Sequence, residues 1–227
     1  MHLPISDKIE LNILHQNSHQ AEKNKVKFNN YNLLCLNIMS SPGAGKTRLL
    51  EITLEDLSKK FHSAVLEGDM TTNLDAARLE KLNIPVVPIT TGRACHLDAN
   101  MVSGGLKLLE KKINPDLLDI LLVENVGNLV CPAEFEIGEH FKVALLSITE
   151  GEDKPLKYPI MFREADLILI TKVDLLPHLN FDINELKSNI ASTNPKADVI
   201  EISSITKSGL DLWQDWISKK ILKFKNI

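Results

Sequence analysis

Short runs of apolar residues alternate along this chain with longer segments in which apolar residues recur every three or four positions. Runs of the first kind are typical of buried β-strands, and segments of the second kind are typical of helices with one apolar face. The pattern predicts strands over residues 33–39, 64–67, 85–89, 120–124, 142–148, 167–171 and 199–203. It predicts helices over residues 47–60, 74–82, 97–112 and 209–222. This alternation indicates an α/β fold, with a mostly parallel, doubly wound sheet flanked by helices.

The first 30 residues do not follow this pattern. They are rich in Asn, Gln and Lys, with Ile5, Ile9 and Ile13 at helical spacing and no core pattern after them. We therefore predict an N-terminal helix or arm over residues 1–30 and one domain over residues 31–227. His15 and His19 would share a face of that helix, and we interpret them as part of a solvated surface.

The composition excludes several classes of protein. The 227 residues are 44% hydrophobic and carry a formal net charge of -4, which favours one well-buried core and gives no electrostatic case for a nucleic-acid or membrane partner. The first residues do not resemble a signal peptide, and no apolar run is long enough to cross a membrane. We expect a cytoplasmic protein in which the three cysteines are free thiols, with Cys35 buried in a strand.

The predicted first strand leads directly into the segment SSPGAGKT at residues 40–47, which a helix follows. Small residues let successive backbone N–H groups point at phosphate oxygens, and the helix N-terminus adds partial positive charge. Lys46 would reach the β- and γ-phosphates, and the Thr47 hydroxyl would bind Mg²⁺. Ser40 stands where the strict motif has glycine, but the strand before and helix after it support a phosphate-binding loop. The residues expected to contact nucleotide here are Pro42, Gly43, Ala44, Gly45, Lys46, Thr47 and Arg48.

The segment TKVD at residues 171–174 indicates which base is bound. It follows an apolar strand, so the Asp174 carboxylate can accept hydrogen bonds from guanine N1–H and the exocyclic amine, whereas adenine would present an acceptor to it. Lys172 would pack along the base, and the late segment SSITK begins at Ser203. The pattern predicts GTP and GDP as ligands, with a base site formed by Thr171, Lys172, Asp174, Ser203 and Ser204.

Acidic residues at two further strand ends are candidates for catalysis. Glu124 ends a predicted strand and Gly127 follows it, which is typical of a segment that responds to the γ-phosphate. Thr47, Asp69 and Glu124 are the expected Mg²⁺ ligands, and Asp69 or Asp75 would orient the attacking water. Asp75 can also be interpreted as an acidic residue in the first turn of a helix. The proposed catalytic residues are Lys46, Asp69, Asp75 and Glu124.

The remaining two cysteines form a possible metal site with a histidine. Cys95 and His96 are adjacent, and Cys131 lies seven residues after Glu124. Two thiolates and an imidazole are soft ligands that suit Ni²⁺ or Zn²⁺. Because a closed tetrahedral site needs four ligands, either an outside ligand or a second subunit would complete this one.

The motifs, taken together, resemble the HypB GTPases, which assist nickel insertion into [NiFe]-hydrogenase. The resemblance extends from about residue 32 onward through SSPGAGKT, EGDMTTNLDAARL, TTGRACHLDA, ENVGNLVCPAEF, TEGEDKPLKYP and ILITKVDLL. It implies a P-loop NTPase of the SIMIBI type, a nucleotide- and metal-dependent homodimer, and a metal site at Cys95, His96 and Cys131. It also implies a HypA-like metallochaperone and a hydrogenase large-subunit precursor as partners, and a lysine, Lys157 or Lys154, near nucleotide.

One departure from the family pattern and two alternative functions accompany this resemblance. Some family members have a cysteine-rich or long histidine-rich N-terminus, whereas this chain has only His2, His15 and His19 there, which disfavours nickel storage. We predict a GTPase with a slow intrinsic rate that couples hydrolysis to nickel delivery. The alternatives are a urease-type nickel-insertion GTPase such as UreG, or a passive nickel- or zinc-binding module with a vestigial nucleotide site.

Overall fold

A seven-stranded sheet forms the centre of the molecule in this computed structural model, which describes residues 5–71 and 74–226; the side chains of residues 5–11 are not described. His2 therefore lies outside the described residues. The strands are β1 (Leu34–Ser40), β2 (Ser63–Asp69), β3 (Val86–Thr90), β4 (Ile120–Glu124), β5 (Phe141–Ser147), β6 (Leu167–Thr171) and β7 (Asp198–Ile202). The α-helices are α1 (Ile5–Asn30), α2 (Lys46–Leu57), α3 (Leu74–Glu80), α4 (Ala99–Leu109), α5 (Cys131–Glu134), α6 (Lys154–Lys157), α7 (Pro159–Glu164), α8 (Ile183–Thr193) and α9 (Leu210–Lys225). Two 3₁₀ turns, η1 (Pro115–Leu117) and η2 (Val173–His178), complete the elements.

The strand order is β3-β2-β4-β1-β5-β6-β7, and the strand pairs are parallel. The chain moves from β1 toward one edge of the sheet, returns to β4, and continues from β5 toward the other edge. This order creates a crevice at the carboxyl end of β1, where open α/β sheets bind their ligands. The prediction of a parallel, doubly wound α/β sheet is confirmed.

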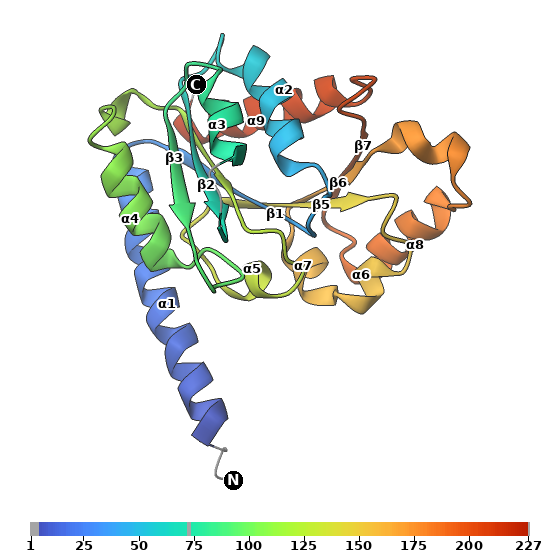
Figure 1. Cartoon of the computed structure of the whole chain (residues 1–227), viewed down its shortest axis with the longest axis horizontal. Helices are drawn as coiled ribbons and strands as arrows, with labels where there is room; N and C mark the ends of the chain where they lie inside the picture. The colour runs from blue at the N-terminus through green and yellow to red at the C-terminus, as the bar shows by residue number, and fades with distance from the viewer. Residues whose placement is uncertain (1–4, 72–73, 227) are drawn as a thin grey trace.

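Helices cover both faces of the sheet, as Figure 1 shows, with α2, α3 and α9 on one side and α1, α4, α7 and α8 on the other. β1 is buried along its whole length, which explains its continuous apolar run. Leu36 faces the core that α2 and α9 complete, while Cys35 faces the core that α4 completes. The prediction that Cys35 is buried in a strand is confirmed.

The predicted and observed elements differ mainly at their ends. β2 runs to Asp69 rather than to residue 67, because its pairing with β3 continues to the pair Asp69 and Thr90. α4 begins at Ala99 rather than at residue 97, because the Asp98 side chain accepts a hydrogen bond from the Met101 N–H at 2.7 Å and caps the helix there.

The N-terminal segment forms α1, which packs along α4. Ala21 and Phe28 of α1 are buried, and Phe28 belongs to the core on that face of the sheet. The division of the chain into residues 1–30 and 31–227 stays a prediction. Across the described part of the chain, we find no helix that combines the length and the apolar character needed to cross a membrane.

Candidate nucleotide and metal site

The phosphate-binding loop lies at the carboxyl end of β1 and leads into α2. Gly43 and Gly45 have φ angles of 77° and 100°, a left-handed backbone that side chains with a Cβ rarely adopt. The loop borders a cavity of about 420 Å³, which is also lined by the end of β2, by α3 and by the segment after β4. Because α2 begins at Lys46, its N-terminus adjoins this cavity and favours an anion there.

Lys46 and Thr47 are both largely buried and both line the cavity. The Lys46 Nζ donates to the Ser40 Oγ at 2.9 Å, and burial lowers the pKa of Lys46. Ser40, the departure from the strict motif, therefore holds the lysine within the loop. The Thr47 Oγ1 donates to Glu124 Oε1 at 2.7 Å, which connects the loop to the end of β4.

A second carboxylate, that of Glu67, lies beside Glu124 on the neighbouring strand. The two residues are register partners of β2 and β4, and they are 2% and 3% exposed. Within the described part of the chain, neither Oε2 atom has a hydrogen-bond partner. Burial raises the pKa of Glu67 to about 8, with Glu124 adding to the rise, and burial raises the pKa of Glu124 to about 7. These carboxylates and the Thr47 hydroxyl are the hard oxygen donors that suit Mg²⁺.

Sequence reasoning missed Glu67 and selected Asp69 and Asp75 from the same segment. The available signal was a carboxylate inside the apolar run SAVLEGD, since a buried charge needs a partner or a function. Only the register between β2 and β4 shows that Glu67 lies opposite Glu124.

The Glu67 carboxyl group gives a prediction for stability. Its pKa rises from 4.5 in an exposed chain to about 8 in the folded protein, so the unfolded state loses this proton more readily. Without metal and nucleotide, the free energy of unfolding should therefore decrease as the pH rises from about 5 to 8. We expect Glu67→Gln to have a higher melting temperature than the parent at pH 8 in a chelator, and a weaker pH dependence. If the melting temperatures of the two proteins decreased equally steeply with rising pH, this prediction would be contradicted.

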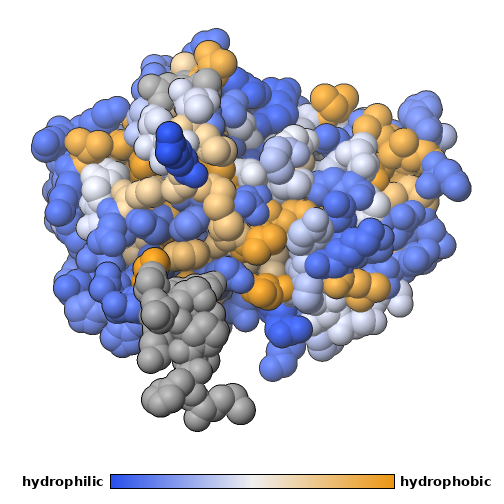
Figure 2. All heavy atoms as spheres, turned by 60° about the horizontal axis from the view of Figure 1, so that its bottom comes forward, coloured by the Kyte–Doolittle hydropathy of each residue, from blue (hydrophilic) through white to orange (hydrophobic). Residues whose placement is uncertain are grey.

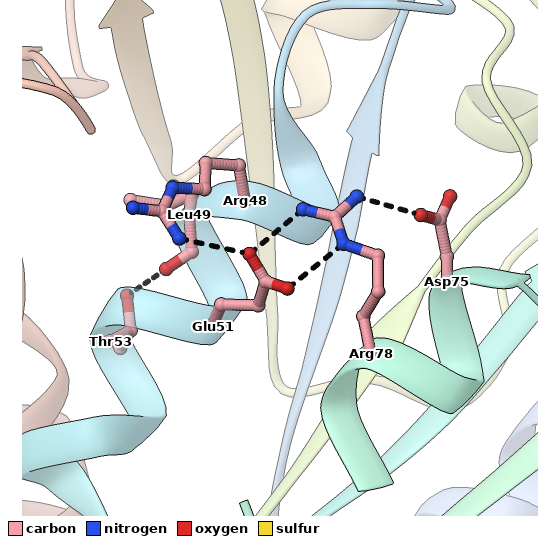
Figure 3. Close-up of polar contacts among 6 residues, drawn as sticks. All are labelled: Arg48, Leu49, Glu51, Thr53, Asp75 and Arg78. Carbon is pink, nitrogen blue, oxygen red and sulfur yellow. Dashed lines mark hydrogen bonds and ion pairs between the residues drawn. The ribbon is translucent and has the colours of Figure 1, made fainter. Parts of the chain in front are cut away.

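Asp69 and Asp75 both line the cavity, but in different surroundings. Asp69 ends β2, and its Oδ1 accepts from the Met70 N–H at 2.5 Å. Asp75 lies in the first turn of α3 and pairs with Arg78 at 3.0 Å, as Figure 3 shows. Arg78 also donates to Glu51 of α2 at 2.8 and 2.9 Å. The structure thus brings both aspartates to the cavity and gives the Asp75 carboxylate a cationic partner.

Arg48 also lines the cavity, and its guanidinium pairs with Glu51 at 3.1 Å. Arg48 and Arg78 thus share one carboxylate on α2, and the pair of Arg78 with Glu51 joins α2 to α3 at the rim of the cavity.

The residues predicted to bind guanine gather beside the phosphate-binding loop. The Thr171 Oγ1 donates to the carbonyl oxygen of Ala44 at 2.8 Å, and the Lys172 Nζ donates to that of Gly43 at 2.8 Å. The Ser203 Oγ donates to Asp174 Oδ1 at 2.5 Å, which orients this carboxylate. Ser204 follows Ser203 and is half-buried.

Gly127 brings the segment after β4 against the phosphate-binding loop. A Cβ at this position would lie 2.9 Å from the backbone N and Cα of Pro42, so a larger residue would force the two segments apart. The next residue, Asn128, donates its N–H to the carbonyl oxygen of Ser40 at 2.7 Å. The segment after β4 is therefore in direct contact with the phosphate-binding loop.

Cys95, His96 and Cys131 form one cluster, with their ligand atoms within 4.8 Å of one another. The two Sγ atoms are 2.8 Å apart, and Cys95 Sγ lies 3.8 Å from His96 Nδ1. The His96 ring stacks on Phe135 at 4.0 Å, and Asn128 Nδ2 lies 3.5 Å from Cys131 Sγ. All three ligand residues are half-buried, so an ion can approach. The set has the soft donors of a nickel or zinc site but only three of the four needed for a closed tetrahedron.

Burial favours the neutral forms of His96 and Cys131 when no metal is bound. Burial lowers the pKa of His96, which leaves the neutral imidazole that ligates metals. Burial and then the neighbouring Cys95 raise the pKa of Cys131 to about 11. A bound metal would have to displace the thiol proton of Cys131.

Lys154 and Lys157 do not line the 420 Å³ cavity. Lys157 is exposed on α6 and pairs with Asp153, and the Lys154 Nζ lies 5.2 Å from the centre of the Tyr158 ring. Within a single copy of the chain, neither residue reaches the phosphate-binding loop.

Comparison with known proteins identifies the family of this chain. The family "CobW/HypB/UreG, nucleotide-binding domain" matches residues 34–201. The chain is 48% identical to the hydrogenase maturation factor HypB of Azotobacter vinelandii over 94% of its own length and 69% of that protein. It superposes on the crystal structure of Helicobacter pylori HypB in complex with nickel with a TM-score of 0.87 and 40% identity, covering 92% of this chain and 96% of that one. The signal recognition particle receptor FtsY of Elizabethkingia anophelis, at 14% identity and a TM-score of 0.52 over 74% of this chain and 57% of that one, shares the fold alone. With a matching family domain and a close relative over nearly its whole length, the chain belongs to the HypB family of hydrogenase maturation factors.

Proposed function

We propose that the protein is a GTP-hydrolysing metallochaperone that couples its nucleotide cycle to nickel delivery into a [NiFe]-hydrogenase precursor. The observation that carries this proposal is the short segment from Glu124 to Cys131. Its first residue binds Thr47 of the phosphate-binding loop, and its last residue belongs to the cysteine and histidine cluster. One segment of eight residues therefore touches both the nucleotide site and the metal site.

Hydrolysis would proceed by in-line attack of water on the γ-phosphate without a covalent intermediate. Lys46 would stabilise negative charge on the phosphates. Mg²⁺ would be held by Thr47 and Glu124 with Asp69 or Glu67, and it would supply charge neutralisation at the β- and γ-phosphates. The pairing of Asp75 with Arg78 supports a slow intrinsic rate, because this carboxylate would have to change partners before it could orient water.

The metal cluster would hold nickel as cargo, and Zn²⁺ would compete for the same soft donors. Three donors suit transient binding, because the ion keeps a position for a ligand from the next protein. Free thiols of this kind persist in the cytoplasm, where we place this activity.

A homodimer would complete the site, and one face of the molecule supports it. Figure 2 turns the side with α5, α6 and α7 toward the viewer and shows apolar groups among polar ones. Val130, Leu156 and Ile160 on this side are 42%, 53% and 42% exposed, and Val130 directly precedes Cys131. Pairing across this face would cover these side chains and bring Lys157 or Lys154 toward the partner's nucleotide. A HypA-like metallochaperone and the hydrogenase large-subunit precursor would be further partners.

A combined measurement of GTP turnover and nickel stoichiometry on the purified protein tests this proposal. We expect steady GTP hydrolysis, no comparable ATP hydrolysis, and one nickel per cluster or per pair of clusters. A protein that binds nickel but does not turn over GTP would be the passive metal-binding module instead. Transfer of the nickel to a urease precursor rather than a hydrogenase precursor would support the urease-type alternative.

The choice of guanine gives a second prediction. Asp174→Asn should weaken GTP binding by about 10- to 100-fold, since charge-assisted hydrogen bonds contribute roughly 1.5–3 kcal/mol each. The same variant should bind xanthosine triphosphate better, because the C2 carbonyl of xanthine accepts a hydrogen bond from the amide. Titration of both nucleotides into the variant and the parent checks this. Asp211→Asn, an exposed position in the first turn of α9, is a control that should leave both affinities unchanged.

A further inference from the structure

Asn125 occupies a buried position between the nucleotide site and the metal cluster. It directly follows Glu124 and is 1% exposed. Its backbone N–H donates to the carbonyl oxygen of Ile38 at 3.0 Å, which attaches the end of β4 to β1 just before the phosphate-binding loop. The main chain of Asn125 thus belongs to the nucleotide site.

The side chain of Asn125 connects three segments. Its Oδ1 accepts from the Leu97 N–H at 2.8 Å and from the Val126 N–H at 2.9 Å, and its Nδ2 donates to Asn37 Oδ1 at 3.1 Å. Leu97 directly follows the ligands Cys95 and His96. Val126 directly precedes Gly127, so one carboxamide oxygen binds both the metal-bearing loop and the segment that lies against the phosphate-binding loop.

Leu97 also contacts the end of β2, which lines the nucleotide cavity. A Cβ on Gly68 would lie only 2.7 Å from the Leu97 side chain, so this leucine packs directly on the strand end between Glu67 and Asp69. Two independent contacts, the hydrogen bond from the Leu97 N–H to Asn125 and the packing of Leu97 on Gly68, therefore join the loop of Cys95 and His96 to residues that line the cavity.

The third partner, Asn37, extends the network to the segment after α5. Its Nδ2 donates to Glu139 Oε1 at 3.3 Å, and Glu139 Oε2 accepts from the Ile137 N–H at 2.8 Å. This chain of contacts therefore reaches the segment that directly follows α5, the helix that begins at Cys131. Such a polar network is rigid when its members are satisfied, so displacement of one member displaces the others.

We propose that Asn125 is the positioning residue that transmits nucleotide state to the metal cluster through its hydrogen bond to the Leu97 N–H. This role rests on the proposed coupling of GTP hydrolysis to nickel delivery. A merely structural asparagine would change the free energy of unfolding or the metal affinity in every state. A coupling residue changes the ratio of metal affinities between nucleotide states, which by linkage equals the ratio of nucleotide affinities with and without metal.

The test is Asn125→Ala, with nickel affinity measured in the presence of GDP and of a non-hydrolysable GTP analogue. In the parent we expect the two affinities to differ by about 5- to 150-fold. In the variant we expect this ratio to fall toward one. A variant that keeps the parent's ratio overturns the role of Asn125 and leaves the proposed function intact. A parent ratio of one contradicts the coupling itself and, with it, this inference.

Asn24 provides a matched control within the same fold. It is a buried asparagine of α1 whose Nδ2 donates to the carbonyl oxygens of Ala99 at 2.7 Å and Ile137 at 3.0 Å. It therefore holds the two metal-bearing segments without contacting the segment from Glu124 to Gly127. Asn24→Ala should weaken nickel binding in both nucleotide states and preserve their ratio. If the ratio of nickel affinities between the two nucleotide states fell equally in Asn24→Ala, the effect would come from a general loosening of the cluster. That result would overturn the proposal.

A second measurement requires no variant and so does not depend on whether Asn125→Ala folds. The Leu97 amide proton is bound by Asn125, so its exchange with deuterium reports this hydrogen bond. We expect exchange in the segment around Leu97 to differ between the GDP and GTP-analogue states of the unmodified protein. Equal exchange in the two states would overturn the proposal.

Discussion

Lys46→Ala is expected to lower the rate of GTP hydrolysis by at least about 100-fold without unfolding the protein. Removal of one preorganised group that stabilises charge in a transition state costs about 10²- to 10³-fold in rate, and Lys46 is the lysine of the phosphate-binding loop. Its own contacts in the folded chain are few, since the Nζ donates to Ser40 within the same loop. Because burial lowers the pKa of Lys46, loss of this buried cation removes an unfavourable desolvation and should not decrease the free energy of unfolding greatly.

The measurement is phosphate release under saturating GTP, together with thermal unfolding of the variant and the parent. Lys59→Ala is the matched control, because Lys59 follows the end of the same helix and pairs with Asp56 in solvent. It should retain the parent's rate. Turnover at the parent's rate in Lys46→Ala would remove the assignment of this loop to phosphate binding.

Cys131→Ala should lower the nickel affinity at least about 100-fold. The remaining nickel affinity should no longer depend on which nucleotide is bound. Loss of residues that merely orient ligands costs 10- to 100-fold in metal affinity, so loss of a ligand should cost at least as much. Cys131 ends the segment that begins at Glu124, whereas Cys95 lies in the loop after β3. Cys95→Ala should therefore lose nickel as well but leave GTP binding nearly unchanged.

Nickel titrations in the GDP and GTP-analogue states, with dimer fraction from sedimentation, provide the measurement. Cys35→Ala is the control, because this third cysteine is buried in β1 away from the cluster. Nickel affinity of the parent should also fall as the pH decreases, since the pKa of Cys131 is raised to about 11 and its proton competes with the metal. Unchanged nickel affinity in Cys131→Ala, or affinity that is independent of pH, would exclude thiolate ligation by this residue.

The sequence by itself determined the elements and motifs that depend on neighbouring residues. The central strands β1, β4 and β6 were predictable because a strand buried on both faces appears as one continuous apolar run. The phosphate-binding loop was predictable because its glycines, Lys46 and Thr47 are consecutive and their conformation is set locally. The donors Cys95, His96 and Cys131 were recognisable by their chemistry, since two thiols and an imidazole are soft ligands for Ni²⁺ or Zn²⁺.

Only the tertiary structure decided which of these residues meet. Cys95 and Cys131 are 36 residues apart in sequence, and they come together because β3 and β4 are both neighbours of β2 and end at the same edge of the sheet. Glu67 lies beside Glu124 because of the register between β2 and β4, and no local sequence pattern predicts that register. Asn125 gained its role in the same way, because its partner Leu97 lies 28 residues earlier in the chain. Contacts of this kind depend on strand order and register, and these are set by the packing of the whole sheet rather than by any one segment.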